Sequence, residues 1–432
     1  MRIYVETYGC QMNEYDSRLI TSILAGHGHA VSTDPVAADI VIVNTCSVRK
    51  RAEIRVIGRL KQLRGLMRPE AALGVVGCVA QRMGDGLLRE VPGLGFVVGT
   101  DQYQKLPDIV ESAGAGRKAV AVDATGTESY DCMPRPDKAS LCEFVSVMRG
   151  CDNYCSYCIV PYVRGRERSR SISDIVGEVA ALVALGTREV TLVGQNVNSF
   201  NDGGKGFANL LAAVDGVEDL LRVRFATSHP KDLSDEIIDA VASLDRVCEH
   251  VHLPVQSGSS EVLAAMNRSY TREEYVALAE KIRAHIPGVA LTTDVIVGFP
   301  GETDERFRET VSLMNETRFD SAFMFRYSVR EGTRAAELAD DVPEGVKIER
   351  LKTIIGLQQC ITTEVNEALV GRGAEVLVEG PSQKDEKLLF GRSRTGKAVV
   401  FPGDAGLVGR VVRVDIAATS AWTLHAGNPV QT

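Results

Sequence analysis

The chain contains no long apolar run and no start that resembles a leader. Its 432 residues include no stretch near the about 18 consecutive apolar residues that a membrane-spanning helix needs. The first ten residues, MRIYVETYGC, alternate in polarity and lack the hydrophobic segment of a signal peptide. We therefore expect a cytoplasmic protein with no membrane partner. In that reducing compartment, ten cysteines favour metal binding over disulfides.

The chain also lacks the net positive charge common among nucleic-acid-binding proteins, since its formal net charge is −8. The acidic excess lies in residues 143–370, which hold 24 Lys and Arg against 35 Asp and Glu, whereas both ends are slightly basic. A local basic surface for phosphate can coexist with this total. The length favours two or three domains, and 44% hydrophobic with 25% charged residues is typical of globular chains.

Strands and helices alternate in the first part of the chain, which predicts an open parallel α/β sheet covered on both faces. The expected strands are RIYVET, DIVIVNT, ALGVVG and GFVVG, and the expected helices are 14–26, 49–67, 80–89 and 101–113. We place this N-terminal domain at 1–115. Residues 116–140 are rich in Gly, Pro and polar residues, so we interpret them as a linker.

The alternation resumes at 141 on a larger scale and predicts a partial (β/α)6 TIM-type barrel with functional loops at the carboxyl ends of its strands. The expected strands are LCEFVSVM, EVTLVG, RVRFAT, CEHVHLPV, VALTTDVIV and SAFMFRYS, and the expected helices are 172–185, 206–215, 234–243, 271–285 and 303–316. Including an amphipathic helix at about 346–369, this domain covers 141–370. Short strands broken by Gly and Pro then predict a small antiparallel β-barrel at 371–432.

Three cysteines with C-x-x-x-C-x-x-C spacing, Cys151, Cys155 and Cys158, follow the first of these barrel strands; we refer to them as the loop triad. Three thiolates on one loop can hold three irons of a 4Fe-4S cube and leave the fourth iron without a protein ligand. An open iron can bind a small molecule through its amine and carboxylate, which is how radical S-adenosylmethionine enzymes begin their chemistry. The alternative is zinc, which needs four ligands and usually takes cysteine pairs spaced two residues apart.

A second set, the sheet triad, consists of Cys10, Cys46 and Cys78, each at the end of an expected parallel strand. Carboxyl ends of parallel strands lie at one edge of a sheet, where ligands bind. These thiols are therefore expected to meet and to hold a second cluster with three protein ligands. The alternative is that they are small buried core residues. For the other four cysteines, Cys132, Cys142, Cys248 and Cys360, packing is the favoured interpretation.

The motifs around both triads resemble those of the methylthiotransferases, in order and over essentially the whole chain. The matching segments are TYGCQMNEYDS (7–17), NTCSVR (44–49), GCVAQ (77–81), RGCDNYCSYCIVPYVRGRERSR (149–170), GQNVNSF (194–200), LPVQSGS (253–259) and VGFPGET (297–303). The resemblance implies an N-terminal cluster domain, a radical S-adenosylmethionine barrel and a C-terminal RNA-binding TRAM domain. CQMNEYDS and QNVNS are most similar to the members that modify N6-dimethylallyladenosine in tRNA. The alternatives are the members that act on threonylcarbamoyl-adenosine or on a ribosomal protein.

The resemblance also implies the roles of the site residues. The loop triad would hold the cluster that cleaves S-adenosyl-L-methionine, and the sheet triad would hold an auxiliary cluster that carries the sulfur to be donated. Contacts with S-adenosylmethionine are expected from polar residues, most of them on or after strand ends: Tyr157, Gln195, Asn196, Ser228, Gln256 and Asp294. The implied reaction is radical insertion of a methylthio group at C2 of the adenosine 3′ of the anticodon. An aromatic C–H of this kind is out of reach of ordinary acid–base catalysis.

The resemblance to the methylthiotransferases also implies the partners of this protein. We expect the tRNA anticodon stem-loop, an electron donor and a sulfur or cluster supplier, and a monomeric enzyme. Three basic segments are candidates for the RNA: residues 47–68, with eight Lys and Arg against one Glu; the arginine loop, Arg164, Arg166, Arg168 and Arg170; and the C-terminal residues Lys384, Lys387, Arg392, Arg394 and Lys397. The alternatives are a solvated face for the first segment and structural ion pairs for the arginine loop.

Overall fold

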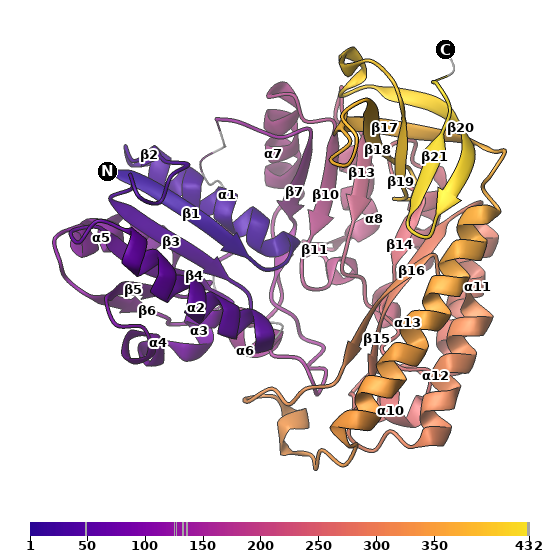
Figure 1. The fold of residues 1–432 in the computed structure, drawn as a ribbon, viewed down its shortest axis with the longest axis horizontal. Helices are drawn as coiled ribbons and strands as arrows, with labels where there is room; N and C mark the ends of the chain where they lie inside the picture. Colours follow the sequence, from indigo (N-terminus) through magenta and orange to yellow (C-terminus); the bar gives the residue numbers. More distant parts are fainter. Residues whose placement is uncertain (48–49, 125, 127, 132–133, 135–136, 430–432) are drawn as a thin grey trace.

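The structure is a computed structural model that describes residues 1–47, 50–124, 126, 128–131, 134 and 137–429. The N-terminal domain lies beside the central barrel, and the small C-terminal barrel lies against one end of the central one (Figure 1). A long helix, α13 (Glu344–Glu367), connects the two barrels. Within the described residues, no helix combines the length and apolarity that a bilayer crossing requires.

The N-terminal domain contains a six-stranded parallel sheet in the order β2-β1-β3-β4-β5-β6. The strands are β1 (Arg2–Tyr8), β2 (Ala30–Val31), β3 (Ile40–Thr45), β4 (Ala72–Gly77), β5 (Leu94–Val98) and β6 (Ala119–Ala121). The helices are α1 (Gln11–Gly26), α2 (Lys50–Leu66), α3 (Cys78–Met83), α4 (Asp85–Glu90) and α5 (Leu106–Gly114). Strands β3 and β4 are buried along their whole length, as expected for a parallel sheet covered on both faces.

The expected parallel sheet is confirmed, with two differences at its edges. The edge strands β2 and β6 were not expected, because two or three residues are too few to show an alternating pattern. Strand β6 lies inside the segment interpreted as a linker, and Tyr130 from the same segment is buried against Tyr103 with ring centroids 5.6 Å apart. Part of 116–140 therefore packs as sheet and core, while the domain boundaries themselves stay predictions.

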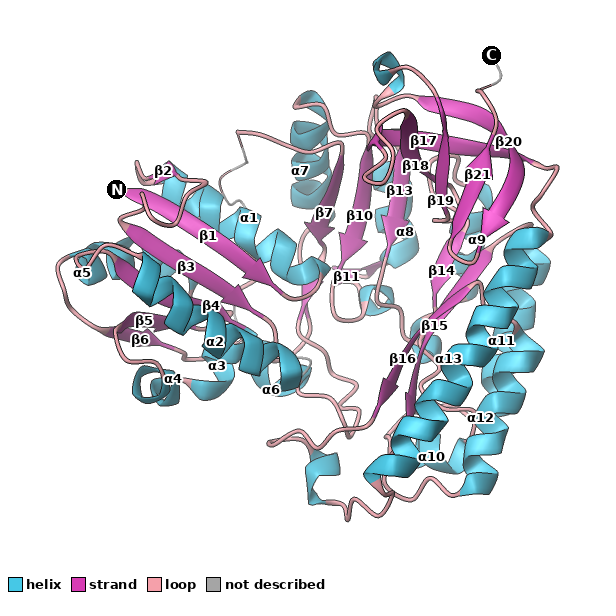
Figure 2. Ribbon diagram, in the orientation of Figure 1, coloured by secondary structure: helices cyan, strands magenta, loops and turns pink. Residues whose placement is uncertain are grey.

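Six parallel strands form the expected open barrel, as two three-stranded sheets, β7-β10-β13 and β14-β15-β16, joined by a bridge between Val223 and Val247. The strands are β7 (Cys142–Ser146), β10 (Glu189–Val193), β13 (Arg222–Phe225), β14 (His250–His252), β15 (Ala290–Val297) and β16 (Ser321–Arg326). The covering helices are α7 (Ile172–Ala184), α8 (Phe207–Asp215), α9 (Asp235–Ser243), α10 (Ser260–Ala265), α11 (Arg272–His285) and α12 (Asp304–Thr317) (Figure 2). Short elements in the loops are β8 (Met148–Arg149), α6 (Val160–Arg164), β9 (Arg168–Ser169), β11 (Asn201–Asp202) and β12 (Lys205–Gly206).

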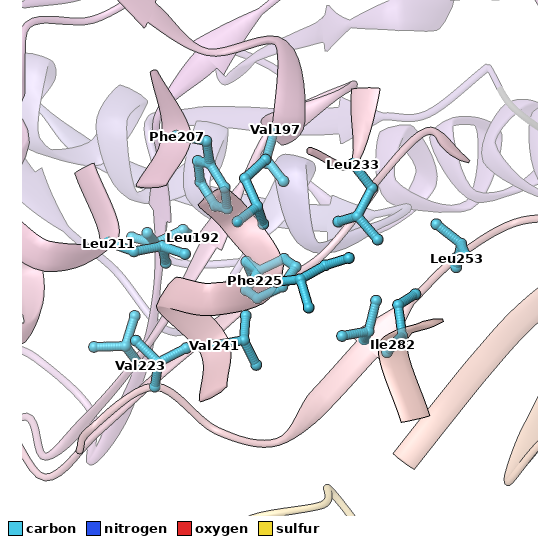
Figure 3. Packing of buried hydrophobic residues seen from close by; sticks show 14 of the residues in the cluster. Leu192, Val197, Phe207, Leu211, Val223, Phe225, Leu233, Val241, Leu253 and Ile282 are labelled. Atoms are coloured by element: carbon cyan, nitrogen blue, oxygen red, sulfur yellow. The ribbon is translucent and has the colours of Figure 1, made fainter. Parts of the chain in front are cut away.

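The core of the barrel lies between its strands and these helices. Leu192 and Phe225 from strands pack with Phe207 from α8, and all three are at most 2% exposed (Figure 3). The rings of Phe207 and Phe225 meet edge-on with centroids 5.4 Å apart. The apolar faces that the sequence pattern predicts for the helices are therefore buried against the strands.

The C-terminal domain is a closed five-stranded barrel in the order β17-β18-β19-β21-β20. Its strands are β17 (Gly373–Pro381), β18 (Leu388–Ser393), β19 (Ala398–Pro402), β20 (Val411–Ser420) and β21 (Thr423–Ala426). Neighbouring strands are antiparallel, as expected, except for the parallel pair β19 and β21. Arg222 and Arg224 of β13 donate to backbone carbonyls of β17, β18 and the turn after β18, so this domain is fixed at the end of the central barrel where the strands begin.

Candidate active site

The register of the N-terminal sheet brings the sheet triad together. Tyr8 of β1 is paired with Thr45 of β3, and Thr45 is paired with Gly77 of β4. Cys10 follows two residues after the first of these positions, and Cys46 and Cys78 follow directly after the other two. Because the three strands are parallel and adjacent, their ends place all three thiols at the same edge of the sheet.

Close backbone packing supports this arrangement. Gly77 has φ of 92°, and a Cβ there would lie 2.5 Å from the Asn44 Oδ1, so the turn that presents Cys78 requires glycine. The buried amides of Asn13 and Asn44 are joined by a hydrogen bond of 3.0 Å, and the Cys10 Sγ donates to the Asn13 Oδ1 over 3.4 Å. These two asparagines lie inside the quoted motifs, but only the structure shows that they connect the end of β3 to α1.

Electrostatics at the sheet triad favour a charged sulfur. A hydrogen bond from Cys46 lowers the pKa of Cys10 to about 6, with a further lowering by the Arg164 charge, although burial acts in the opposite direction. Burial raises the pKa of Cys78, and the Arg164 guanidinium opposes that shift. A lowered pKa favours the thiolate form of Cys10, which is the form that binds metal.

The loop triad lies between β8 and α6 on a backbone held from several sides. Gly150, with φ of 78°, precedes Cys151, and a Cβ there would lie 1.9 Å from the Arg166 carbonyl oxygen. The Cys158 N–H donates to the Cys155 carbonyl over 2.9 Å and closes a turn between the two thiols. The Ser156 N–H donates to the Met266 carbonyl over 2.9 Å, which anchors the loop to the barrel.

Two side chains donate directly to sulfurs of the loop triad. The Arg268 Nη1 lies 3.4 Å from the Cys155 Sγ, and the Asn153 Nδ2 lies 3.6 Å from the Cys151 Sγ. Arg268 is buried and lies 113 residues from its sulfur partner in the sequence, so no local motif could have identified it. Positive charge and N–H donors at the sulfurs stabilise the thiolate form that binds iron.

The chemistry of the loop triad fits a metal cluster. Burial, with the neighbouring Cys155, raises the pKa of Cys158 to about 12, so this sulfur ionises at neutral pH only beside a compensating cation. Among the described residues, no three His, Cys, Asp or Glu side chains converge on the position of a single metal ion. A cube does not require such convergence, because each thiolate binds a different iron.

The two triads lie on segments that pack against each other. Cys78 packs in one apolar cluster with Ile159 and Val163, and Ile159 is the residue directly after Cys158. Helix α3, which begins at Cys78, contacts α6, which follows the loop triad. The edge of the N-terminal sheet therefore faces the loop at the carboxyl ends of the barrel strands.

The six expected contacts of S-adenosylmethionine fall into different environments. The Ser228 hydroxyl and the Asn196 Oδ1 are buried and have no hydrogen-bond partner among the described residues, as expected of groups that face a ligand. The Asn196 Nδ2 donates to Asp232 over 2.7 Å, which fixes the amide. The Gln195 Oε1 instead accepts from the Gly150 N–H over 2.7 Å, so Gln195 positions the loop triad.

The other three positions are held by their surroundings. Gln256 has φ of 71° and bridges to β15, where its N–H donates to the Asp294 carbonyl over 2.9 Å. The Asp294 carboxylate lies 3.5 Å from the His252 Nε2. Tyr157 is half-buried inside the loop triad, and burial raises the pKa of its hydroxyl. Their contact with S-adenosylmethionine stays a prediction.

Ser228→Ala is expected to weaken S-adenosylmethionine binding about three- to tenfold, because one hydrogen bond contributes about 0.5–1.5 kcal/mol net. Since the Ser228 hydroxyl has no hydrogen-bond partner to lose among the described residues, the free energy of unfolding should change by less than about 0.5 kcal/mol. Calorimetric titration of anaerobically reconstituted protein measures the first quantity and urea denaturation the second. Thr363→Ala on α13 is the control, because the half-buried Thr363 hydroxyl donates to the Gln359 carbonyl of its own helix. An unchanged affinity would contradict the assignment.

The arginine loop is mostly structural, which favours ion pairing over RNA contact. Arg164 pairs with Asp16 over 2.8 Å, Arg168 pairs with Asp101 over 2.9 Å, and Arg170 pairs with Glu178 over 2.8 Å. Only Arg166 is exposed, where it pairs with Asp152. Asp16 and Asp101 are distant in sequence from Arg164 and Arg168, so local charge alone could not separate the two interpretations.

The other two basic segments each have some exposed Lys or Arg side chains. On α2, Arg59 pairs with Glu6, whereas Arg55 and Lys61 are exposed; Arg49 and the side chains of Lys50 and Arg51 lie outside the described residues. In the C-terminal barrel, Arg394 and Lys397 pair with Glu249 and Asp320 of the central barrel, and Arg392 pairs with Glu379. Contact of these three residues with RNA stays a prediction. Lys384 and Lys387 remain exposed.

Among the described residues, the three cysteines outside the two triads show no sign of a cluster. Cys142 begins β7, Cys248 is buried before β14, and Cys360 is exposed on α13. Cys132 lies outside the described residues. Packing stays the interpretation for the three described ones.

Three family models match successive parts of the chain. Residues 2–99 match the uncharacterized protein family UPF0004, residues 145–314 match the radical SAM superfamily, and residues 367–427 match the TRAM domain. The chain is 48% identical over 421 residues to the tRNA-2-methylthio-N(6)-dimethylallyladenosine synthase of Carboxydothermus hydrogenoformans, covering 96% of each protein. The protein of the same name from Moorella thermoacetica is 45% identical, with 97% of this chain and 96% of that protein covered.

Solved structures share the fold at low sequence identity. The radical S-adenosylmethionine methyltransferase TsrM from Kitasatospora setae, with cobalamin and a 4Fe-4S cluster bound, gives a TM-score of 0.57 at 16% identity, covering 75% of this chain and 74% of that one. The cobalamin-dependent S-adenosylmethionine radical enzyme OxsB gives a TM-score of 0.54 at 12% identity, covering 83% and 56%. The likeness to both shows a shared fold over most of this chain.

Proposed function

The chain belongs to the tRNA-2-methylthio-N(6)-dimethylallyladenosine synthases, radical S-adenosylmethionine enzymes of tRNA modification, and we propose that its six cysteines of the loop and sheet triads hold two 4Fe-4S clusters. The reaction is insertion of a methylthio group at C2 of N6-dimethylallyladenosine 3′ of the anticodon. The observation that carries the two-cluster proposal is the strand register that ends at Cys10, Cys46 and Cys78, on an edge packed against the loop triad.

The clusters, when bound, supply the radical that activates the C2–H and the sulfur that replaces the hydrogen. The protein's own residues prepare the two sites. Arg268 and Asn153 donate hydrogen bonds to sulfurs of the loop triad, while Gln195 holds the backbone at Gly150. Ser228 and Asn196 present buried polar atoms to S-adenosylmethionine. We expect the packing of the N-terminal domain on the barrel to shield the site from groups that would quench a radical.

The tRNA contacts in our proposal are divided between two ends of the molecule. The target adenosine enters at the edge where both triads lie, next to α2 with its exposed Arg55 and Lys61. The C-terminal barrel lies where the strands of the central barrel begin, so its exposed Lys384 and Lys387 would contact RNA away from the target base. An electron donor, a sulfur or cluster supplier and a monomeric state complete the proposal.

Replacing Arg55 and Lys61 together by Gln is expected to reduce the slope of log K against log salt for tRNA binding by about 1.5, because each lost phosphate contact removes about 0.7–0.9. Fluorescence anisotropy measures this slope between about 50 and about 200 mM salt, where phosphate contacts dominate the affinity. Lys352→Gln on α13, which removes an exposed cation paired with Glu349, is the control. A slope equal to that of the parent would exclude α2 from the RNA interface.

Anaerobic reconstitution with iron and nucleoside analysis tests the proposed function. We expect about eight irons per chain, the content of two cubes, and methylthiolated adenosine only from tRNA that carries the dimethylallyl group. About four irons would overturn the two-cluster proposal. Turnover of threonylcarbamoyl-adenosine tRNA or of a ribosomal protein, in preference to the prenylated tRNA, would overturn the substrate assignment.

A further inference from the structure

The central barrel is open on one side, between its two terminal strands. Strands β7 and β16 end the two sheets, and no backbone ladder joins them among the described residues. Strand β7 lies next to α1 of the N-terminal domain, and Phe144 of β7 packs against the core of that domain (Figure 2). The β7 side of the opening is therefore covered by protein. Strand β16 lies next to α13, which packs on the outer face of the strand.

Phe323 of β16 lies on the inner face of this open barrel. Its strand neighbour Met324 packs against the barrel core that also contains Ile354 of α13, so the alternation of side chains along the strand places Phe323 on the other face. The ring of His252 from β14 meets the Phe323 ring with centroids 6.1 Å apart. Phe323 is nevertheless 60% exposed. Side chains fill the interior of a closed barrel, whereas here a phenyl ring stands in solvent.

The surroundings of this ring are polar. Asp294 of β15 is the register partner of Phe323, and its carboxylate lies 3.5 Å from the His252 Nε2. The His252 Nδ1 lies 3.0 Å from the Thr292 Oγ1. An accessible flat ring beside hydrogen-bonding groups fits a ligand with an apolar face and a polar edge, which describes a nucleobase. A dimethylallyl group has no polar atom and would desolvate the carboxylate without giving it a partner.

The Phe323 ring lies between the C-terminal barrel and the carboxyl ends of the central strands. Asp320, directly before β16, pairs with Lys397 of the C-terminal barrel over 2.7 Å. Arg326 ends β16 at the carboxyl ends of the strands, on the side of the loop triad. Phe323 is three residues from Asp320 and three from Arg326, which is about 10 Å along a strand in each direction. An RNA loop that extends from the C-terminal barrel to the two triads passes this ring.

We propose that Phe323, with His252 beside it, is a stacking platform for the base of an unpaired anticodon-loop nucleotide next to the target adenosine in the RNA sequence. The inference rests on the proposed function, because it names a contact of the tRNA substrate. A target base that leaves its stack to reach the two triads deprives the neighbouring base of a stacking partner. The phenyl ring replaces that partner, and its contribution is binding alone.

The test measures binding of a fluorescently labelled anticodon stem-loop that carries N6-dimethylallyladenosine to the anaerobically reconstituted full chain. Phe323→Ala should raise the dissociation constant about tenfold or more, the effect of losing one stack between a base and an aromatic ring. Phe323→Trp keeps an aromatic face and should bind within about threefold of the parent, whereas Phe323→Leu, which keeps only apolar bulk, should bind as weakly as Phe323→Ala. Leu185→Ala removes a 42% exposed apolar side chain directly after α7 and should leave the constant unchanged.

Abasic nucleotides identify the base that stacks on Phe323. The nucleotide on the 5′ side of the target adenosine and the one on the 3′ side are made abasic in separate stem-loops, and each is titrated into the parent and into Phe323→Ala. At the stacked position, the abasic stem-loop should bind the parent about tenfold more weakly, and Phe323→Ala should cause no further loss. Full additivity of the two changes at both positions would overturn the platform.

The design separates failure of this inference from failure of the proposed function. Calorimetric titration should give the same S-adenosylmethionine affinity for the parent and Phe323→Ala. A loss of that affinity with unchanged RNA binding would assign the ring to S-adenosylmethionine and overturn the platform. Full RNA affinity in Phe323→Ala would also overturn it and leave the proposed function intact. A parent that does not bind the stem-loop would overturn the proposed function and the platform together.

Discussion

Cys155→Ala is expected to abolish both the cleavage of S-adenosylmethionine and the methylthio product, a loss on the order of a thousandfold or more, because the cluster carries the radical chemistry that side chains lack. The variant removes the sulfur that accepts from Arg268 and leaves only two thiolates on the loop. Chromatography of 5′-deoxyadenosine under strong reductant measures the first reaction, and mass spectrometry of tRNA nucleosides measures the second. Iron content should fall to about four per chain, since the sheet triad is intact.

A matched variant in the other triad separates the two clusters. Cys46→Ala should also lower the iron content to about four and eliminate the methylthio product, yet 5′-deoxyadenosine should still form from the intact loop triad. Cys360→Ala, which changes an exposed cysteine on α13, is the control and should match the parent in all three measurements. Methylthio product at the parent level from either cluster variant would contradict the assignment of that triad.

The sheet triad could be predicted because its placement depends only on strand order. Each of Cys10, Cys46 and Cys78 follows a strand of the parallel sheet, and parallel strands end at a common edge. The spacing between these cysteines carries no such signal. The loop triad was identified from its local spacing alone, and most barrel helices begin and end within a residue or two of their expected bounds.

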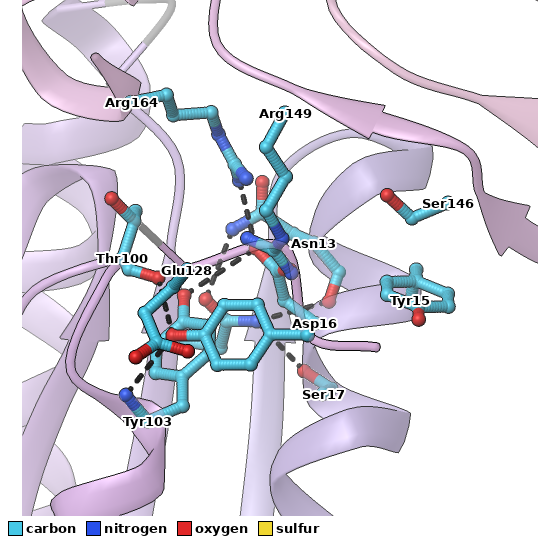
Figure 4. A network of polar contacts seen from close by, with 12 residues as sticks. Asn13, Tyr15, Asp16, Ser17, Thr100, Tyr103, Glu128, Ser146, Arg149 and Arg164 are labelled. Carbon is cyan, nitrogen blue, oxygen red and sulfur yellow. Dashed lines mark hydrogen bonds and ion pairs between the residues drawn. The ribbon is translucent and has the colours of Figure 1, made fainter. Parts of the chain in front are cut away.

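The polar surroundings of the site could not be predicted, because they join residues far apart in sequence. Asp16 and Arg149 are separated by 133 positions, and Arg268 lies 113 positions from Cys155. A run of arginines after a cluster loop has the same local pattern whether it contacts RNA or buried carboxylates. The fold distinguishes the ion-pair interpretation from the RNA interpretation, since α1 places Asp16 beside Arg164 where the two domains meet (Figure 4).

Asp16→Asn is expected to be the most destabilising single substitution near the site, at about 3–5 kcal/mol, because it leaves two buried guanidinium groups without their shared counter-charge. Both Arg149 and Arg164 lose their only carboxylate partner within the described residues. Urea denaturation at neutral pH measures the change in the free energy of unfolding. Asp152→Asn, which breaks an exposed pair with Arg166, is the control and should cost less than about 1 kcal/mol.

The contribution of Asp16 to the free energy of unfolding should decrease as the pH falls. Burial alone would raise the pKa of Asp16, but the charges of Arg149 and Arg164 lower it below its ordinary value in the folded protein. A carboxyl group whose folded pKa is depressed stabilises the protein fully above its unfolded pKa, and this contribution is lost as pH falls through the folded pKa. The parent and the Asp16→Asn variant should therefore differ most at neutral pH and converge in acid. A difference that grows as the pH falls would show that the carboxylate is not held in its charged form by the two arginines.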